Sequence, residues 1–213
     1  MAKAPKTAYV CNDCGAEFSR WQGQCSACKA WNTISEVRLI SASNSTKNDR
    51  FSGYAGETRA KIQTLSEISL QETPRFTSGF KELDRVLGGG IVPGSAILIG
   101  GHPGAGKSTL LLQVMCGLAK NMTALYVTGE ESLQQVAMRA NRLNLPTDKL
   151  NMLSETSVEQ ICNLADQLKP QIIVVDSIQV MHLSDIQSSP GSVAQVRECA
   201  SFLTRYAKTR QVA

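Results

Sequence analysis

The chain has 213 residues, of which 42% are apolar and 19% are charged, as is usual for a globular domain of one α/β unit with a small additional module. Its apolar runs are far shorter than the roughly 20 residues that cross a bilayer, and the N-terminal MAKAPKTAYV carries two lysines with no apolar stretch behind them. These features exclude a transmembrane segment and a secretory signal, so we expect a cytoplasmic protein with no membrane partner.

The formal net charge of +4 is concentrated near the N-terminus. Residues 1–61 contain nine basic and five acidic side chains, whereas the remaining residues contain thirteen of each. This excess favours a polyanionic partner such as nucleic acid. From charge alone, an ordinary solvated surface explains it equally well.

The first predicted module is a zinc finger over residues 8–37. Cys11 and Cys14 form one Cys-x2-Cys pair, Cys25 and Cys28 form another, and ten residues separate the pairs. Two such pairs present four thiolates tetrahedrally to one Zn²⁺, and zinc binding supplies the folding free energy that so short a module lacks. Gly15 suits the tight turn after the first pair. Four unrelated thiols are the alternative, and redox chemistry would need only one pair.

Two tryptophans lie inside this module and leave two interpretations open. Trp21 and Trp31, with Arg20 and Lys29 beside them, match a surface that stacks on and pairs with a single nucleic-acid strand. Aromatic side chains in small modules also commonly pack the core. Residues 38–61, rich in Ser, Asn, Gly and charge, are predicted to be a flexible linker.

From residue 62 to residue 213, strands and helices alternate, which predicts a parallel sheet with flanking helices. The expected strands are residues 96–100, 124–128, 151–153 and 172–176. The expected helices follow residue 106, span residues 132–143 and 158–168, and run from about residue 192 to about residue 210. Cys116, Cys162 and Cys199 stand singly in these helices, where buried free thiols are expected.

A phosphate-binding loop lies between the first of these strands and its helix. Residues 101–108 (GHPGAGKS) match the P-loop pattern in the strand–loop–helix context that the pattern requires. Backbone N–H groups at the helix start face the phosphates, the Lys107 ammonium neutralises the β and γ phosphates, and the Ser108 hydroxyl binds Mg²⁺. The predicted nucleotide site comprises Gly101, His102, Pro103, Gly104, Ala105, Gly106, Lys107, Ser108 and Thr109.

Acidic residues at two strand ends complete a hydrolytic site. Asp176 ends an apolar strand and is predicted to orient the magnesium shell beside Ser108, although a strand-end Asp also commonly caps a turn. Glu130 is the predicted general base, and Glu131 is the reserve. Because acids are favoured in the first turn of a helix, we expect one of the two glutamates to act and the other to begin the helix that follows.

These motifs together resemble those of the RadA (Sms) family of bacterial DNA repair proteins, and the resemblance covers essentially the whole chain. Beyond the zinc and phosphate motifs, it rests on six stretches: residues 21–24 (WQGQ), 31–33 (WNT), 83–95 (LDRVLGGGIVPGS), 129–132 (GEES), 175–179 (VDSIQ) and 188–198 (SSPGSVAQVRE). It implies a RecA-like, ring-forming, DNA-stimulated ATPase that drives branch migration of recombination intermediates. The implied partners are single-stranded or branched DNA and recombinase-type repair proteins.

The resemblance also assigns residues. The four cysteines become zinc ligands, residues 101–108 become the Mg²⁺–ATP site, and Glu130 takes the place of the catalytic glutamate. The region of residues 188–197 is expected near DNA, and Arg197, Arg205, Lys208 and Arg210 are candidate phosphate contacts, although a solvated helix face explains these four equally well.

Two departures from the family are expected to matter differently. His102 stands where the family usually has Asp or Asn, and little effect on ATP is expected because the loop works there through its backbone. The family continues beyond residue 213 with another core strand, a Lys-Asn-Arg-Phe-Gly motif and a Lon-like domain. Because the implied strand lies between the P-loop strand and the strand ending at Asp176, the chain is expected to be a fragment with a central gap and poor activity alone.

Two other classes of function remain open. One is an ATP-binding regulatory switch, as in clock-type relatives of the same fold, with zinc-mediated protein contacts. The other is a zinc-module DNA-binding protein with a vestigial ATPase, which the set Lys107, Ser108, Glu130 and Asp176 argues against. Stimulation of ATP turnover by single-stranded DNA separates the enzyme from the switch.

Overall fold

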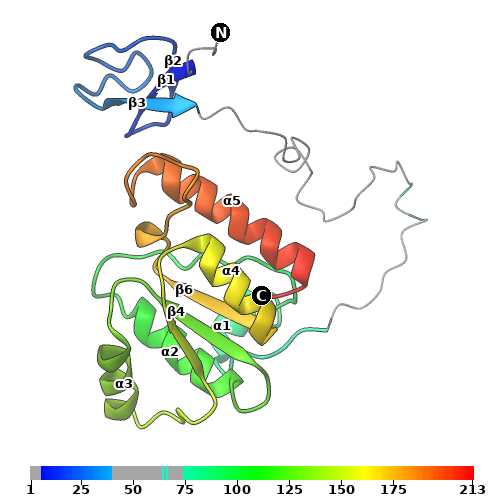
Figure 1. Ribbon diagram of the computed structural model, residues 1–213. Coiled ribbons are helices and arrows are strands. Elements are labelled where there is room, and N and C mark those ends of the chain that lie inside the picture. Colours follow the sequence, from blue (N-terminus) through cyan, green and yellow to red (C-terminus); the bar gives the residue numbers. More distant parts are fainter. Residues whose placement is uncertain (1–5, 40–63, 65, 67–73) are drawn as a thin grey trace.

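The structure is a computed structural model that describes residues 6–39, 64, 66 and 74–213 (Figure 1). The predicted linker of residues 38–61 therefore lies outside the described residues from residue 40 onward. Its first two residues belong to a strand instead. No helix among the described residues is long and apolar enough to cross a membrane.

A small antiparallel sheet forms the N-terminal module. Its strands are β1 (Lys6–Cys11), β2 (Glu17–Phe18) and β3 (Ile34–Leu39), in the order β2-β1-β3. The register pairs Cys11 with Ile34 and Val10 with Glu17, so β1 delivers the first cysteine to the end of the sheet. The strands extend two residues beyond each end of the predicted module, because the β1–β3 ladder continues to the pair Lys6 and Leu39.

A parallel sheet forms the centre of the larger part. Its strands are β4 (Ala124–Thr128), β5 (Asn151–Ser154) and β6 (Ile172–Asp176), in the order β5-β4-β6. All five residues of β4 are buried, as expected for the central strand of a sheet that is covered on both faces. The predicted strands at residues 124–128, 151–153 and 172–176 are confirmed.

Helices cover both faces of this sheet, in agreement with the predicted fold class (Figure 1). Helices α2 (Lys107–Leu118) and α3 (Leu133–Arg142) pack with Tyr126 and Val174 on one face, and α4 (Val158–Leu168) and α5 (Val193–Arg210) pack with Val127 and Ile173 on the other. Alternate residues of each strand thus pack into two separate hydrophobic cores, one on each face of the sheet. A short helix α1 (Lys81–Val86) and a 3-10 turn (Ile178–Val180) complete the elements.

Serine side chains determine where three of the helices begin. The hydroxyls of Ser132, Ser157 and Ser192 accept hydrogen bonds from backbone N–H groups three residues later, at the starts of α3, α4 and α5. Each cap satisfies a donor that the helix leaves without an internal partner. The helices expected over residues 132–143, 158–168 and 192–210 are confirmed to within one or two residues.

One predicted strand is absent. Residues 96–100 adopt no strand structure, and Ile97 and Leu98 are 43% and 86% exposed. The apolar composition of this segment is that of a buried strand, but no described strand lies alongside it to complete a hydrogen-bonded ladder. The prediction of a strand at residues 96–100 is therefore wrong for this structure.

A cavity of ≈ 390 Å³ lies where that ladder would be. Residues 96–99, β6, part of α5 and the last residues of the chain line it. The backbone of Ala213 has already begun to pair with β6, because its N–H donates to the Gln171 carbonyl and its carbonyl accepts from the Ile173 N–H. Residues 96–99 and β6 thus line one cavity, and a further strand between them stays a prediction.

Candidate functional site

The loop of residues 101–106 presents its backbone toward open space at the start of α2. Gly104 and Gly106 have φ of +78° and +85°, and a Cβ added at either would meet no atom within 4 Å. A side chain would be strained at these positions, whereas glycine lets a ligand approach the backbone closely. The first N–H groups of α2 have no partner inside the helix and point in the same direction, toward any group held by the loop.

The Lys107 ammonium lies over this loop. Its Nζ donates to the carbonyls of Gly101 at 2.8 Å and His102 at 3.0 Å. His102 contributes its carbonyl oxygen to this contact, in keeping with a loop that works through its backbone at that position. Lys107 and Asp176 also line the same cavity, so the cation and the strand-end carboxylate lie on one surface.

These residues fit a Mg²⁺–nucleoside triphosphate. The open loop with positive φ, the helix N-terminus and the ammonium match phosphate oxygens, and the hydroxyl and carboxylate oxygens of Ser108 and Asp176 are hard ligands of the kind that Mg²⁺ prefers. The contact between Ser108 and Asp176 stays a prediction.

Asp176 is held by a residue that sequence reasoning missed. The hydroxyl of Tyr126 on β4 donates to Asp176 Oδ2 on β6 at 2.6 Å, and Tyr126 is fully buried. Burial raises the pKa of Tyr126 and the hydrogen bond to Asp176 raises it further, so the hydroxyl keeps its proton and remains a donor. One carboxylate oxygen is thereby fixed and Oδ1 is left for the magnesium shell.

The Y126F chain is expected to need about 10-fold more Mg²⁺ for tight nucleotide binding, because Asp176 loses the donor that orients it. Binding of a fluorescent ATP analogue, titrated with Mg²⁺, measures this shift, and binding without Mg²⁺ should stay as in the parent chain. The matched control is Y206F, which removes a hydroxyl that donates to Asp166 at 2.9 Å. Equal Mg²⁺ dependence in Y126F and the parent would contradict the role of Tyr126.

Glu130 lies at the end of β4 next to the end of β6. The Ser177 hydroxyl donates to Glu130 Oε1, and Glu130 is exposed. The peptide bond between Asp176 and Ser177 is cis. Glu130 is thus connected to the residue that follows Asp176, at the carboxyl edge of the sheet where ligands collect in α/β folds.

Glu131 is engaged differently. Its carboxylate forms an ion pair with Arg139 of α3, and its backbone N–H and carbonyl both bond to the Thr128 hydroxyl. Neither glutamate begins the helix, because Ser132 is the N-cap and α3 starts at Leu133. The expectation that one of the two would start the helix is wrong. The Glu131 carboxylate is paired with Arg139, whereas the Glu130 carboxylate is exposed, and this difference favours Glu130 as the base.

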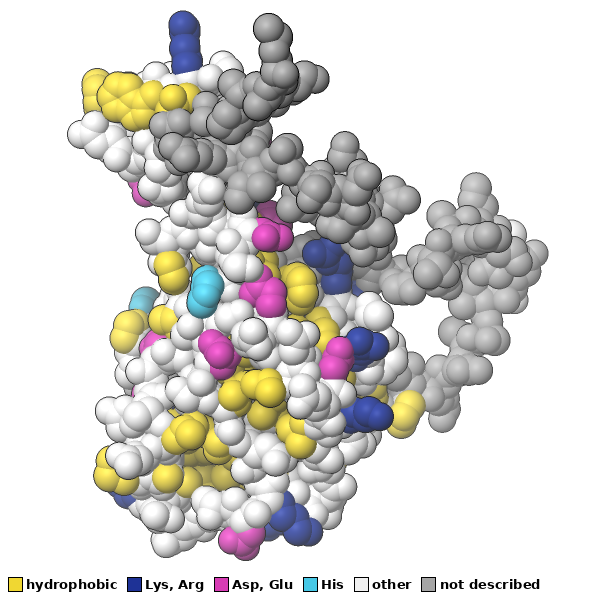
Figure 2. Space-filling model, viewed as in Figure 1, with side chains coloured by type: hydrophobic (Ala, Val, Ile, Leu, Met, Phe, Trp, Pro, Cys, Tyr) yellow, Lys and Arg dark blue, Asp and Glu magenta, His cyan; other side chains and the backbone are white. Residues whose placement is uncertain are grey.

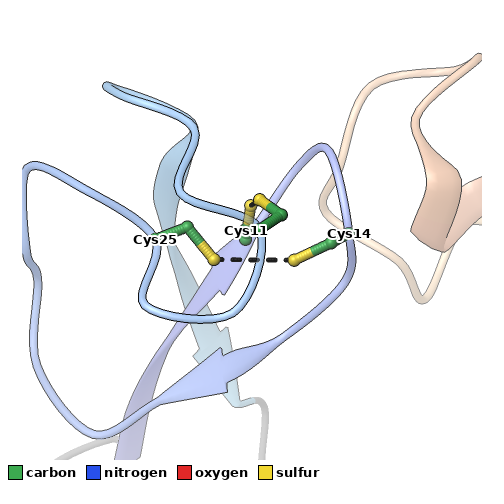
Figure 3. Close-up of side chains that lie close together, drawn as sticks. Cys11, Cys14 and Cys25 are labelled. Atoms are coloured by element: carbon green, nitrogen blue, oxygen red, sulfur yellow. Dashed lines mark hydrogen bonds between the residues drawn. The ribbon is translucent and has the colours of Figure 1, made fainter.

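The four cysteines of the N-terminal module converge on one point. Figure 3 labels three of them, Cys11, Cys14 and Cys25. Their sulfur atoms lie within 4.8 Å of one another, with Cys11 Sγ 3.7 Å from Cys28 Sγ and Cys14 Sγ 3.5 Å from Cys25 Sγ. Sulfurs at 2.3 Å from a tetrahedral Zn²⁺ are about 3.8 Å apart, so the cluster fits zinc.

The pKa values of Cys11 and Cys28 are shifted in opposite directions. Burial raises the pKa of Cys11, but hydrogen bonds from the Thr33 hydroxyl and neighbouring N–H groups outweigh burial and lower the pKa to about 6. A hydrogen bond from the Ala30 N–H lowers the pKa of Cys28, whereas burial and the neighbouring thiols raise it, with a net value of about 12. Four thiolates therefore need a cation between them, which a bound Zn²⁺ supplies.

The two cysteine loops repeat one backbone design. The N–H of Gly15 bonds to the Cys11 carbonyl and the N–H of Lys29 bonds to the Cys25 carbonyl, both at 2.8 Å. Both residues are left-handed, with φ of +73° at Gly15 and +65° at Lys29. The first loop has glycine at this position, as expected, whereas the second holds a lysine in a conformation that costs about 1–2 kcal/mol for residues with a side chain.

The K29G chain is expected to bind zinc about 2- to 5-fold more tightly, because relief of this strain exceeds the extra chain entropy of glycine. Competition with a zinc chelator measures the change. The matched control is G15A, which places a Cβ in the left-handed region of the first loop and should weaken zinc binding. Unchanged zinc affinity in both variants would show that the loops do not carry this strain.

The four predicted DNA contacts all lie on α5, but two are engaged with neighbouring acids. Arg210 pairs with Asp166 at 2.7 Å and Arg197 with Glu198 at 3.3 Å. The Arg197 guanidinium also lies against the first cysteine loop, 3.3 Å from the Cβ position of Gly15. Arg205 and Lys208 have interactions of their own, so a role in DNA binding stays a prediction for all four.

The three single cysteines are buried and free, as predicted. Burial raises the pKa of Cys116, of Cys162 to about 12 and of Cys199 to about 11. Thiols with such pKa values are unreactive at neutral pH, so they serve packing.

Comparisons with known proteins agree with this geometry. A family model described as a rubredoxin metal binding domain matches residues 9–36, and an ATPase model described as KaiC matches residues 76–161. The chain is 93% identical over its whole length to the DNA repair protein RadA of Haemophilus influenzae, 72% to that of Escherichia coli and 44% to that of Bacillus subtilis. It spans 46% of the length of each of these relatives.

The fold and the two sites define a RecA-like P-loop ATPase domain joined to a four-cysteine zinc ribbon. Along its entire length the chain is similar to bacterial proteins named DNA repair protein RadA, and both parts agree with this likeness in their order.

Proposed function

We propose that this chain carries the nucleotide site and zinc module of a DNA-dependent ATPase of recombinational repair, which couples ATP hydrolysis to branch migration on single-stranded or branched DNA. The observation that supports the proposal is that Lys107 and Asp176 line one cavity, while Glu130 accepts a hydrogen bond from Ser177, the residue after Asp176. The relatives are named DNA repair proteins, which supports repair as the setting.

Each of these residues has a distinct role in the proposed reaction. The backbone N–H groups of residues 104–109 and the Lys107 ammonium would hold the phosphates, and Ser108 and Asp176 would hold Mg²⁺, which would neutralise phosphate charge. Glu130 orients a water molecule and accepts its proton as that water attacks the γ phosphorus, whose bond to the β–γ bridging oxygen breaks to release ADP and inorganic phosphate. Tyr126 keeps Asp176 in position.

The cavity lined by residues 96–99 and β6 is expected to lower ATP turnover. A strand inserted there would pair with β6 and bury Ile97 and Leu98, bringing the P-loop and Asp176 into one continuous sheet. We propose that the longer relatives supply such a strand and that they assemble as rings in the cytoplasm with recombinase-type partners. ATP turnover is therefore expected to be low in the 213-residue chain and higher in a chain lengthened with the remaining sequence of a relative.

The test is ATP turnover of the lengthened chain with and without single-stranded and branched DNA. Clear stimulation by DNA supports the proposal, and turnover that is indifferent to DNA contradicts it. Equal turnover by the 213-residue chain would show that the cavity has no part in activity.

A second candidate is favoured by one observation, the match of residues 76–161 to the ATPase model described as KaiC. It is an ATP-binding regulatory switch that uses zinc to mediate protein contacts. This candidate predicts ATP-dependent association with protein and no response of turnover to DNA.

A further inference from the structure

We propose that Trp21 and Trp31, flanked by Arg20 and Lys29, form a second nucleic-acid site, a stacking platform for the bases of a single strand on the zinc module. The site is separate from the nucleotide-binding loop and needs no hydrolysis. The choice of nucleic acid as its ligand rests on the repair function proposed above.

The two rings are on the surface and take no part in the module's core. Trp21 is 58% exposed and Trp31 is 69% exposed, whereas the buried core consists of Cys11, Cys25 and Ile34 with Tyr9, Cys14, Ala16 and Phe18 packed around them. The interpretation that the tryptophans pack the core is thus wrong. Figure 2 shows hydrophobic side chains gathered on the N-terminal module, at the top of the view, beside a basic side chain.

The rings converge on a bare stretch of backbone. A Cβ added at Gly23 would lie 3.7 Å from the ring of Trp21 and 3.9 Å from the ring of Trp31. No side chain of residue 23 separates them, so both rings lie beside the same backbone position. Two neighbouring exposed aromatic rings suit successive bases, because every base has a stacking face.

The backbone under the rings is held in place although the rings are exposed. Gln24 and Trp31 form an antiparallel bridge, the Asn32 N–H bonds to the Gly23 carbonyl at 2.8 Å, and the Gln24 side chain bonds to the Lys29 carbonyl at 2.9 Å. A platform held in this way loses little freedom when a ligand binds, which favours affinity.

The positive charge around the two rings favours a polyanionic ligand. The segment of residues 20–31 (RWQGQCSACKAW) contains two basic and no acidic residues, and both basic side chains are exposed. Phosphates between stacked bases need such cations beside the rings. Duplex DNA keeps its bases stacked on one another, so a single strand fits the rings better.

The chain offers a direct probe, because it has two tryptophans and both belong to the platform. Titration of the zinc-loaded 213-residue chain with oligo(dT) is expected to quench the tryptophan fluorescence to saturation and to quench it less at higher salt. Duplex DNA of the same length should quench it less. Binding of labelled oligo(dT), followed by anisotropy, gives the affinity independently.

W21A and W31A are each expected to weaken oligo(dT) binding about 10-fold, and W21F and W31F should restore most of it. R20Q should weaken binding and reduce its salt dependence. The matched control is M138A, which removes a 64% exposed apolar side chain from α3 and should leave oligo(dT) binding unchanged. Zinc content and binding of a fluorescent ATP analogue, both unaltered, show that each variant is folded.

The proposal is overturned if oligo(dT) binds by anisotropy without changing the tryptophan fluorescence, or if the alanine variants bind as the parent does. If the alanine variants kept DNA binding but lost association with another protein, Trp21 and Trp31 would be a protein-docking surface, and the stacking platform would also be refuted. Unchanged oligo(dT) binding in W21A and W31A, together with turnover that DNA still stimulates, refutes the platform alone. Quenching without DNA-stimulated turnover refutes the repair ATPase alone.

Discussion

The E130Q variant of the lengthened chain is expected to bind ATP as tightly as the parent and to turn it over at least 100-fold more slowly. An amide accepts a hydrogen bond from water but takes no proton at neutral pH, and loss of a general base costs about 10²–10⁴ in rate. The contact from the Ser177 hydroxyl survives, because the amide oxygen accepts it as the carboxylate does. Single-turnover hydrolysis and binding of a fluorescent ATP analogue separate the two effects.

E131Q is the matched control at the neighbouring position. It removes the charge partner of Arg139, whose side chain is only 16% exposed and whose Nη1 is buried without a hydrogen-bond partner among the described residues. The expected cost is about 1–3 kcal/mol of stability, seen as a lower thermal midpoint, with a much smaller effect on the hydrolysis step. If E131Q abolished turnover and E130Q did not, the assignment of the base to Glu130 would be wrong.

Removal of zinc is expected to unfold the module of residues 9–36 and leave the larger part folded. Three residues, Cys11, Cys25 and Ile34, make up the buried core of this module, which is too little to offset chain entropy. Structural zinc in small modules contributes about 10–16 kcal/mol, so the fold depends on it. C25S, which replaces a fully buried ligand, should have the same effect as a chelator.

Tryptophan fluorescence follows this unfolding, since both tryptophans lie in the module. Far-UV circular dichroism follows the helices, which are all in the larger part among the described residues. Loss of zinc should change the tryptophan fluorescence and hardly move the thermal midpoint measured by circular dichroism. A large shift of the helical midpoint would instead mean that the contact of Arg197 with the Gly15 loop couples the two parts. C116S serves as a control for cysteine replacement, because Cys116 lies outside the cluster.

The elements that sequence predicts well are those with local signals. The strand of residues 172–176 is an apolar run ended by an acid, and the helices begin at serines whose hydroxyls cap them. The cysteine spacing likewise predicts a cluster that the structure forms. In each case the necessary partners lie within a few residues or repeat at fixed intervals.

The failures have a common physical cause, which is dependence on distant partners. Residues 96–100 read as a strand, but a strand exists only beside another strand, and composition does not show which one. Tyr126 was missed because its partner Asp176 is 50 residues away and an inward-facing tyrosine in a strand looks like ordinary core. Tyr126 lies two residues before Thr128, on the same face of β4, and Thr128 pairs with Asp176. A polar aromatic residue at this spacing from the strand end was the signal that could have indicated the contact. The ion pair that distinguishes Glu131 from Glu130 also depends on packing of α3.

The edge of β6 affects how the 213-residue chain behaves in solution. Apart from Ala213, no described segment pairs with this edge, and beside it lie the apolar side chains of Ile97 and Leu98. An open strand edge with apolar flanks is a template for the same edge of another molecule. Concentration-dependent self-association of the purified chain is therefore expected, and it would reflect pairing between the β6 edges of two molecules and not ring assembly. Conditions that keep the chain dilute, or a peptide that occupies the edge, should suppress it.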